Sequence, residues 1–275
     1  MRKFKPLWVA AVSVALCFSA AAHLHAQDTT ATAEPVKKDV PYVPTPQPVV
    51  DRMLEMAGVK KGDVVYDLGC GDGRIIVTAA KKHGATGIGV DIDPERIKES
   101  NDNAKAAGVT DKVKFIKQDL FTMEFKDANV LAMYLLPDVN LKLRPKILDD
   151  MKPGSRIVSH SFDMDDWKPD EEDTVDDSTI YFWTVPAKVE GTWNATIKPA
   201  GGGAEQKGTI ELKQKFQEVS GTAKVGDKND ALKDVKLKGN ELSFTIGDAK
   251  YTAKVDGSKL TGKDDKQGSL TAEKK

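Results

Sequence analysis

Acidic side chains and closely spaced glycines between residues 67 and 119 have the types and spacing of a ligand-binding site. The stretch 67–73 reads D-L-G-C-G-D-G and directly follows the apolar residues 64–66. Asp91 and Asp119 each follow a later apolar run. Glycine lets a backbone approach a ligand closely, and carboxylates accept hydrogen bonds from hydroxyl and amino groups. These residues therefore predict a site for a ligand that carries hydroxyls and an amino or cationic group.

The glycine spacing separates this loop from a pyrophosphate-binding loop. Dinucleotide sites use G-x-G-x-x-G and direct a helix N-terminus at the pyrophosphate. Here the spacing is G-x-G-x-G, with Asp67 before the glycines and Asp72 among them. Two carboxylates would repel a pyrophosphate. They suit S-adenosylmethionine, which has a sulfonium, an amino group and no phosphate, and we expect no metal.

Strand and helix patterns alternate from residue 48 to residue 185, which predicts an α/β doubly wound sheet with parallel strands. Ligands bind at the carboxyl ends of the strands in such sheets, so the residues that follow the strands are the candidates. The expected helices are 48–58, a helix that follows the glycines and ends near 83–84, 94–107 and 137–151. The expected strands are 64–68, 86–90, 113–116, 129–136, 156–161 and 179–185.

The three acidic motifs, in this order at strand ends, resemble those of class I S-adenosylmethionine-dependent methyltransferases over about residues 40–186. The resemblance implies that Asp67, Gly69 and Gly71 bind the methionine part, that Asp91 binds the ribose and that Asp119 binds the adenine. The arm P-Y-V-P-T-P at 41–46 is similar to a lid of small protein-lysine methyltransferases. The further cofactor-binding candidates are Tyr42, Thr45, Asp72 and Leu120.

Two other stretches resemble SET-independent histone-lysine methyltransferases. They are Y-L-L-P-D-V-N at 134–140 and K-P-G-S-R-I-V-S-H at 152–160. That family has polar asparagines just before its proline. This chain has Leu131, Ala132, Met133 and Tyr134 instead. The resemblance implies methyl transfer to a protein lysine, and a small-molecule acceptor stays open.

Methyl transfer from a sulfonium is an in-line displacement, in which an enzyme mainly positions the two reactants. The catalytic candidates are Tyr134 and His160, with Asp163 as a further side chain at the same strand ends. Tyr134 is the first choice because an aromatic ring also contacts a cationic acceptor. The alternatives are that Tyr134 is a core aromatic, that His160 is a structural buried histidine and that Asp93 caps the helix beginning at Pro94.

The first 26 residues have the pattern of a secretory signal peptide. Three basic residues precede an apolar run over about 7–22, and we expect cleavage after Ala26, or alternatively after Ala22. A linker at 27–39 follows. The prediction is an exported protein of the periplasm or cell envelope, without a stable membrane span after signal removal. The alternative is an uncleaved N-terminal anchor.

Residues 187–275 form a separate C-terminal block with a different pattern. Apolar and polar residues alternate between glycine-containing turns, as in Leu242, Phe244 and Ile246. This pattern predicts seven or eight antiparallel strands in a small β-barrel or sandwich domain. The sequence does not identify a partner for it.

Charge is unevenly distributed along the chain. Residues 27–186 contain 29 acidic and 21 basic residues, whereas residues 187–275 contain 13 and 17. An acidic domain argues against nucleic acid as a partner, because phosphates bind basic surfaces. The acidic runs at 163–166 and 170–173 are read as solvated loops, with a docking site for a basic substrate as the alternative. The alternative function is a non-catalytic envelope protein that keeps the fold as a scaffold.

Overall fold

The computed structural model describes residues 41–275 and contains two β-sheets, one of seven strands and one of nine. The seven-stranded sheet belongs to the part of the chain that carries the acidic motifs, and the nine-stranded sheet is formed by the part that follows. The expected signal peptide at 1–26 and linker at 27–39 lie outside the described residues, as does Val40. Within residues 41–275, no helix is both long enough and apolar enough to cross a membrane.

The seven-stranded sheet has the doubly wound topology that the sequence predicts. Its strands are β1 (Val64–Leu68), β2 (Thr86–Asp91), β3 (Val113–Lys117), β4 (Val130–Met133), β5 (Arg156–His160), β6 (Glu171–Val175) and β7 (Ser178–Thr184). The strand order is β3-β2-β1-β4-β5-β7-β6. Strands β1 to β5 pair in parallel, while β7 pairs antiparallel with both β5 and β6.

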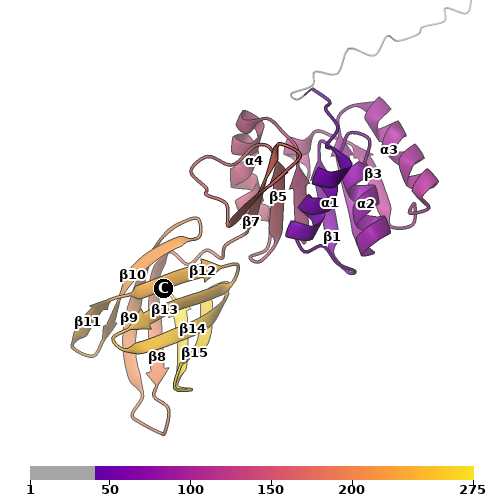
Figure 1. The fold of residues 1–275 in the computed structure, drawn as a ribbon. Coiled ribbons are helices and arrows are strands. Elements are labelled where there is room, and N and C mark those ends of the chain that lie inside the picture. The colour runs from indigo at the N-terminus through magenta and orange to yellow at the C-terminus, as the bar shows by residue number, and fades with distance from the viewer. Residues whose placement is uncertain (1–40) are drawn as a thin grey trace, which may run out of the picture. The chain divides into compact units, whose positions relative to one another are not determined.

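Helices cover both faces of this sheet (Figure 1). They are α1 (Gln47–Met56), α2 (Arg74–His83), α3 (Pro94–Ala107) and α4 (Pro137–Asp150), with a single 3-10 turn at Leu120–Thr122. The apolar stripes of α1, α2 and α3 pack against one face, around Val65, Val130 and Val158. Helix α4 packs against the other face, around Leu131 and Ile157.

The strand order reverses between β1 and β4, which lie side by side in the sheet. Ligands of doubly wound sheets bind in the crevice at the carboxyl ends of strands at this switch point. The glycine loop follows β1 and Tyr134 follows β4. The fold therefore brings together two segments that are about 60 residues apart in the sequence.

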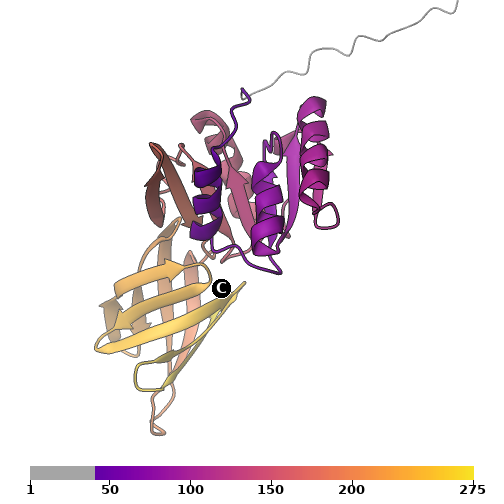
Figure 2. The ribbon, with the colours of Figure 1, turned by 45° about the vertical axis from the view of Figure 1, so that its right-hand side comes forward.

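The nine-stranded sheet is antiparallel throughout and curls into a nearly closed barrel (Figure 2). Strands β10 and β12 approach each other across the opening. Trp193, Phe244 and Leu270 are among the buried side chains of its interior. The strands are β8 (Gly191–Lys198), β9 (Gln206–Lys215), β10 (Glu218–Val225), β11 (Lys228–Ala231), β12 (Lys233–Lys238), β13 (Glu241–Ile246), β14 (Ala249–Asp256), β15 (Lys259–Asp264) and β16 (Ser269–Lys274).

Three expectations about the strands differ from the structure. The barrel has nine strands where seven or eight are expected, because the short strand β11 adds an edge next to β10. The expected strand at 129–136 is shorter, since β4 ends at Met133 and an extended segment leads into α4. The acidic run at 170–173 is not a loop, because most of it forms the edge strand β6.

Candidate active site

The glycine loop between β1 and α2 turns the chain sharply over the end of the sheet. Gly69, Gly71 and Gly73 have positive φ values of 77°, 53° and 77°, a backbone region that only glycine adopts at no steric cost. The N–H groups of Gly69 and Cys70 both donate to Val90 O, at 2.8 and 2.9 Å. These bonds fasten the loop to the carboxyl end of β2, beside Asp91.

Asp91 organises the same loop through both of its carboxylate oxygens. Oδ2 accepts the N–H of Gly71 and Oδ1 accepts the N–H of Asp93, each at 2.9 Å. Asp93 in turn caps α3, since its Oδ1 accepts the N–H of Glu95. The sequence left this capping role open as an alternative for Asp93. Asp91 therefore supports the backbone that encloses the pocket and is also part of the pocket wall.

Asp67 is the most buried acid of the site, with 2 % of its surface exposed. Burial, followed by the negative charges of Asp91 and Asp72, raises the pKa of Asp67 to about 8. A carboxyl group in this environment gains most from a positively charged partner. The three carboxyl groups of Asp67, Asp72 and Asp91 therefore favour the binding of a cationic ligand.

Asp72 is joined to Arg74 by a forked ion pair. The guanidinium donates from Nε to both carboxylate oxygens at 3.0 Å and from Nη2 to Oδ2 at 2.6 Å. Nη1 of the same side chain donates to Thr45 O at 2.9 Å. Arg74 thus connects the glycine loop to the arm at 41–46, a role that the sequence analysis did not find.

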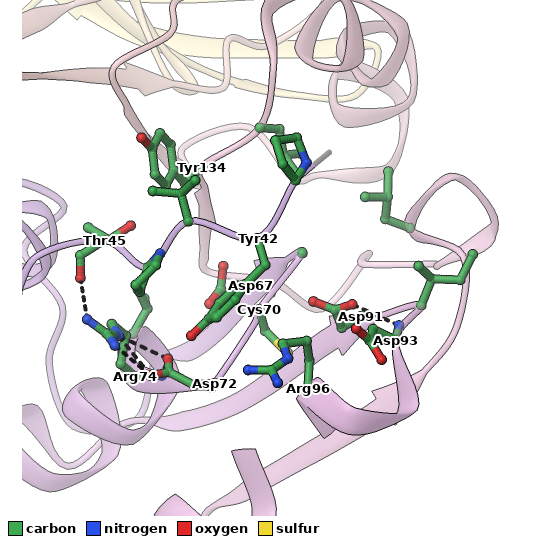
Figure 3. A pocket seen from close by; sticks show the side chains of 18 of the residues that line it. Tyr42, Thr45, Asp67, Cys70, Asp72, Arg74, Asp91, Asp93, Arg96 and Tyr134 are labelled. Carbon is green, nitrogen blue, oxygen red and sulfur yellow. Dashed lines mark hydrogen bonds and ion pairs between the residues drawn. The ribbon is translucent and has the colours of Figure 1, made fainter. Parts of the chain in front are cut away.

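The arm crosses the glycine loop and closes one side of the pocket (Figure 3). A Cβ atom added at Gly71 would collide with the Tyr42 ring, so the absent side chain makes room for the arm. The guanidinium carbon of Arg96 lies 4.6 Å from the centre of the Tyr42 ring, a cation–π contact. Arginines from α2 and α3 therefore hold the arm at two points.

The space in and in front of the pocket, with the open solvent at its mouth included, is about 900 Å³. Asp119 is part of the pocket wall, and its Oδ1 accepts the N–H of Phe121 at 2.9 Å. Gly71 and His160 do not line the pocket, although both contact residues that do. The predicted site residues that line it are Tyr42, Thr45, Asp67, Gly69, Asp72, Asp91, Asp119, Leu120 and Tyr134.

His160 lies behind Tyr134, with its ring centre 3.9 Å from that of the tyrosine. Its Nδ1 is hydrogen-bonded to Thr45 Oγ1 at 3.2 Å. Burial lowers the pKa of His160 to about 4, so the ring is neutral at physiological pH. An imidazole with this pKa is a poor base for an ammonium group. Asp163 does not line the pocket, and its Oδ1 accepts the N–H of Asp165.

These residues fit S-adenosylmethionine by their chemistry. The glycine loop has no side chains at Gly69, Gly71 and Gly73, where φ is positive. The buried Asp67 suits an ammonium group. Asp91 and Asp119 offer carboxylates for hydroxyl and amino groups. Ile92, Leu120 and Leu135 supply apolar walls for a flat ring. Among residues 41–275, no cluster of His, Cys, Asp or Glu has the arrangement of a metal site.

We expect donor binding to release a proton. At pH 7 a carboxyl group with a pKa of about 8 is mostly protonated, and a cationic ligand favours its ionised form. Calorimetry at about pH 7 in two buffers of different ionisation enthalpy should give different heats, and the difference should vanish in Asp67→Asn. Equal heats in both buffers for the unmodified chain would contradict this account of Asp67.

Comparisons with known proteins agree with this chemistry. The family described as ANTKMT methyltransferase domain matches residues 67–171. A protein-lysine N-methyltransferase of Saccharolobus islandicus (strain REY15A) is 46% identical over 151 residues, which cover 53% of this chain and 94% of that protein. The chain belongs to the S-adenosylmethionine-dependent methyltransferases. The aligned part is little more than half of this chain.

A solved structure agrees with the methyl donor. The crystal structure of an RNA methyltransferase from Salinibacter ruber in complex with S-adenosyl-L-homocysteine is 52% identical, with a TM-score of 0.53, and the match covers 54% of this chain and 96% of that one. S-adenosylmethionine is therefore the methyl donor of this enzyme, and the non-catalytic alternative is not favoured.

A second lysine methyltransferase is less similar to this chain. The adenine nucleotide translocase lysine N-methyltransferase of Mus musculus is 29% identical over 135 residues. That match covers 49% of this chain and 58% of the mouse protein.

Proposed function

We propose that the enzyme transfers the methyl group of S-adenosylmethionine to the ε-amino group of a protein lysine. The observation that carries this proposal is the position of Tyr134, whose ring shares the pocket wall with Asp67 and Thr45 (Figure 3). An aromatic face at this position attracts an alkylammonium group. The name of the Saccharolobus islandicus relative, a protein-lysine N-methyltransferase, supports the same acceptor.

The charge of the domain favours a cationic acceptor over RNA. Residues 27–186 have eight more acidic than basic residues. Such a domain attracts lysine-rich segments and repels phosphate backbones. The charge and the aromatic wall therefore favour the same class of acceptor.

The transfer needs positioning more than acid–base groups from the protein. The donor supplies an electrophilic methyl group on its sulfonium. The lysine nitrogen uses its lone pair to form the N–C bond as the C–S bond breaks, and one proton leaves to water. His160 is too weak a base to take that proton, because its pKa is about 4 and that of lysine is about 10.4. Only the neutral amine has a free lone pair, so the ammonium form of the lysine must lose a proton to water before the displacement.

The proposal is tested with the purified full-length chain and S-adenosylmethionine labelled in its methyl group. Poly-L-lysine, poly-L-arginine and total cellular RNA are offered in separate reactions at equal mass. We expect label in poly-L-lysine and none above background in the other two polymers. Label in RNA, or in no polymer while the donor binds, would overturn the proposed acceptor.

We also propose that the protein is exported and that the mature chain begins at Gln27. This proposal rests on the basic start, apolar run and small residues of 1–26. N-terminal sequencing of the protein from the cell envelope of its host should give Gln27 as the first residue. Recovery of a chain that starts at Met1 in the cytosol would contradict it.

A further inference from the structure

A strained turn lies directly after β5, next to the pocket. Ser161 has a φ of 63°, in the left-handed region where a residue with a Cβ atom is penalised by about 1–2 kcal/mol. The N–H of Phe162 donates to His160 O at 2.8 Å, which closes a tight three-residue turn. A serine keeps such a conformation only where its surroundings enforce it.

Four hydrogen bonds with residues of β5, β7 and α4 hold this turn and the residue that follows it in place. Ser159 Oγ donates to Phe162 O at 2.6 Å, and the N–H of Ser161 donates to Thr179 O at 2.7 Å. Asn140 Nδ2 donates to the carbonyls of Phe162 and Asp163, each at 3.2 Å. The strain at Ser161 is thus imposed by contacts from β5, β7 and α4.

Asn140 is a polar residue at a fully buried position. It lies on the first turn of α4, in the stretch P-D-V-N, and has no exposed surface. Its Oδ1 accepts no hydrogen bond from the described residues 41–275. A buried acceptor without a partner costs about 1–3 kcal/mol. The asparagine therefore contributes little to stability, and the contribution that the structure shows is its donation to the turn.

The turn directs two aromatic rings onto Tyr134. The His160 ring lies 3.9 Å from the tyrosine ring, and the Phe162 ring stacks at 6.3 Å with an interplanar angle of 19°. Tyr134 follows β4 and cannot change rotamer freely while both neighbours stay in place. The turn thereby fixes the orientation of the ring that lines the pocket.

We propose that Asn140 is a positioning residue for the acceptor and that Phe162 helps to determine acceptor specificity. Through the turn at 160–162, Asn140 holds His160 and Phe162 against Tyr134, so that an aromatic wall of fixed shape receives the amine. This inference rests on the proposed function for the amine, but the positioning role applies to any acceptor that contacts Tyr134.

The main test compares two buried or partly buried asparagines that bind different loops. Asn140→Ala should raise the acceptor KM about tenfold, because small misplacements of a positioning wall are costly, while the Kd of S-adenosyl-L-homocysteine by calorimetry stays within about twofold. Asn103 is the matched control, since its Nδ2 donates to Asp72 O at 2.9 Å on the donor side. Asn103→Ala should raise the donor Kd about fivefold and leave the acceptor KM unchanged.

The acceptor in these assays is the polymer that the unmodified chain labels, poly-L-lysine or RNA. Failure of the lysine proposal is thus seen in the unmodified chain, before any variant is compared. Ser159→Ala removes a single hydrogen bond of the turn, that of Ser159 Oγ to Phe162 O, and should change the acceptor KM in the same direction. Phe162→Leu should raise the acceptor KM without changing the donor Kd. The proposal is overturned if Asn140→Ala and Ser159→Ala leave the acceptor KM unchanged, or if they weaken donor binding as much as acceptor binding.

Discussion

Replacing Asp91 with alanine will weaken donor binding about 100-fold, the largest loss that we expect from a single side chain in the pocket. The variant removes the acceptor of two backbone N–H groups, those of Gly71 and Asp93. Hydrogen bonds to a charged group contribute about 1.5–3 kcal/mol each. The lower limit for two such losses, about 3 kcal/mol, corresponds to about two powers of ten in affinity. Calorimetric titration with S-adenosyl-L-homocysteine measures the change directly.

The matched control for this variant is Asp111→Ala. Asp111 is an exposed carboxylate in the segment between α3 and β3, so its removal changes the net charge by the same amount without touching the pocket. We expect its Kd to equal that of the unmodified chain. If Asp91→Ala also retains that affinity, the assignment of the pocket to the donor is wrong.

The second large effect is a loss of stability at Gly73. A Cβ atom at this position would lie 2.7 Å from the Phe115 ring and 2.9 Å from Ser100 Cβ, and the glycine has a φ of 77°. Overpacking costs about 1–3 kcal/mol and a left-handed alanine about 1 kcal/mol or more. Gly73→Ala should therefore lower the free energy of unfolding by about 2–4 kcal/mol, measured by urea denaturation.

Gly108→Ala separates the two contributions. Gly108 has a similar φ of 70°, but nothing lies within 4 Å of an added Cβ atom. We expect this control to lose only the backbone part, about 1 kcal/mol. Equal losses for Gly73→Ala and Gly108→Ala would show that close packing behind the glycine loop is not what excludes a side chain there.

Elements with strong local signals were predicted with accurate bounds. The helix expected at 94–107 is observed at Pro94–Ala107. Asp93 caps its first turn, Pro94 fits the first helical position, and Gly108 ends it in the left-handed conformation. Each of these signals lies within a few residues of the element it controls. The glycine loop was predicted for the same reason.

The strand β6 could not be predicted because its residues carry the pattern of a solvated segment. Its sequence is E-E-D-T-V, and its side chains are exposed or half-buried. It is the edge strand beyond β7, where charged residues protect a sheet from further pairing. A hydrophobic pattern therefore has no reason to appear in it.

Several residues of the site could not be predicted because their roles depend on distant contacts. From the sequence, Arg74 would be expected to be an exposed basic residue at the start of a helix. In the structure its guanidinium donates to Thr45 O, 29 residues away. Asn140 and Phe162 meet only after α4 and β5 pack together. The stretch P-D-V-N was recognised as a motif, but nothing in its spacing indicates which carbonyl groups Asn140 would bind.

The most direct test of the central claim is the chemical identity of the methylated product. Poly-L-lysine labelled by the full-length enzyme is hydrolysed in acid, and its amino acids are separated beside standards. We expect the label to elute with Nε-methylated lysines, and we expect Asp91→Ala to reduce the label through its loss of donor affinity. Label that is released as methanol in mild base would identify a carboxyl ester at the chain terminus instead and would contradict lysine as the acceptor.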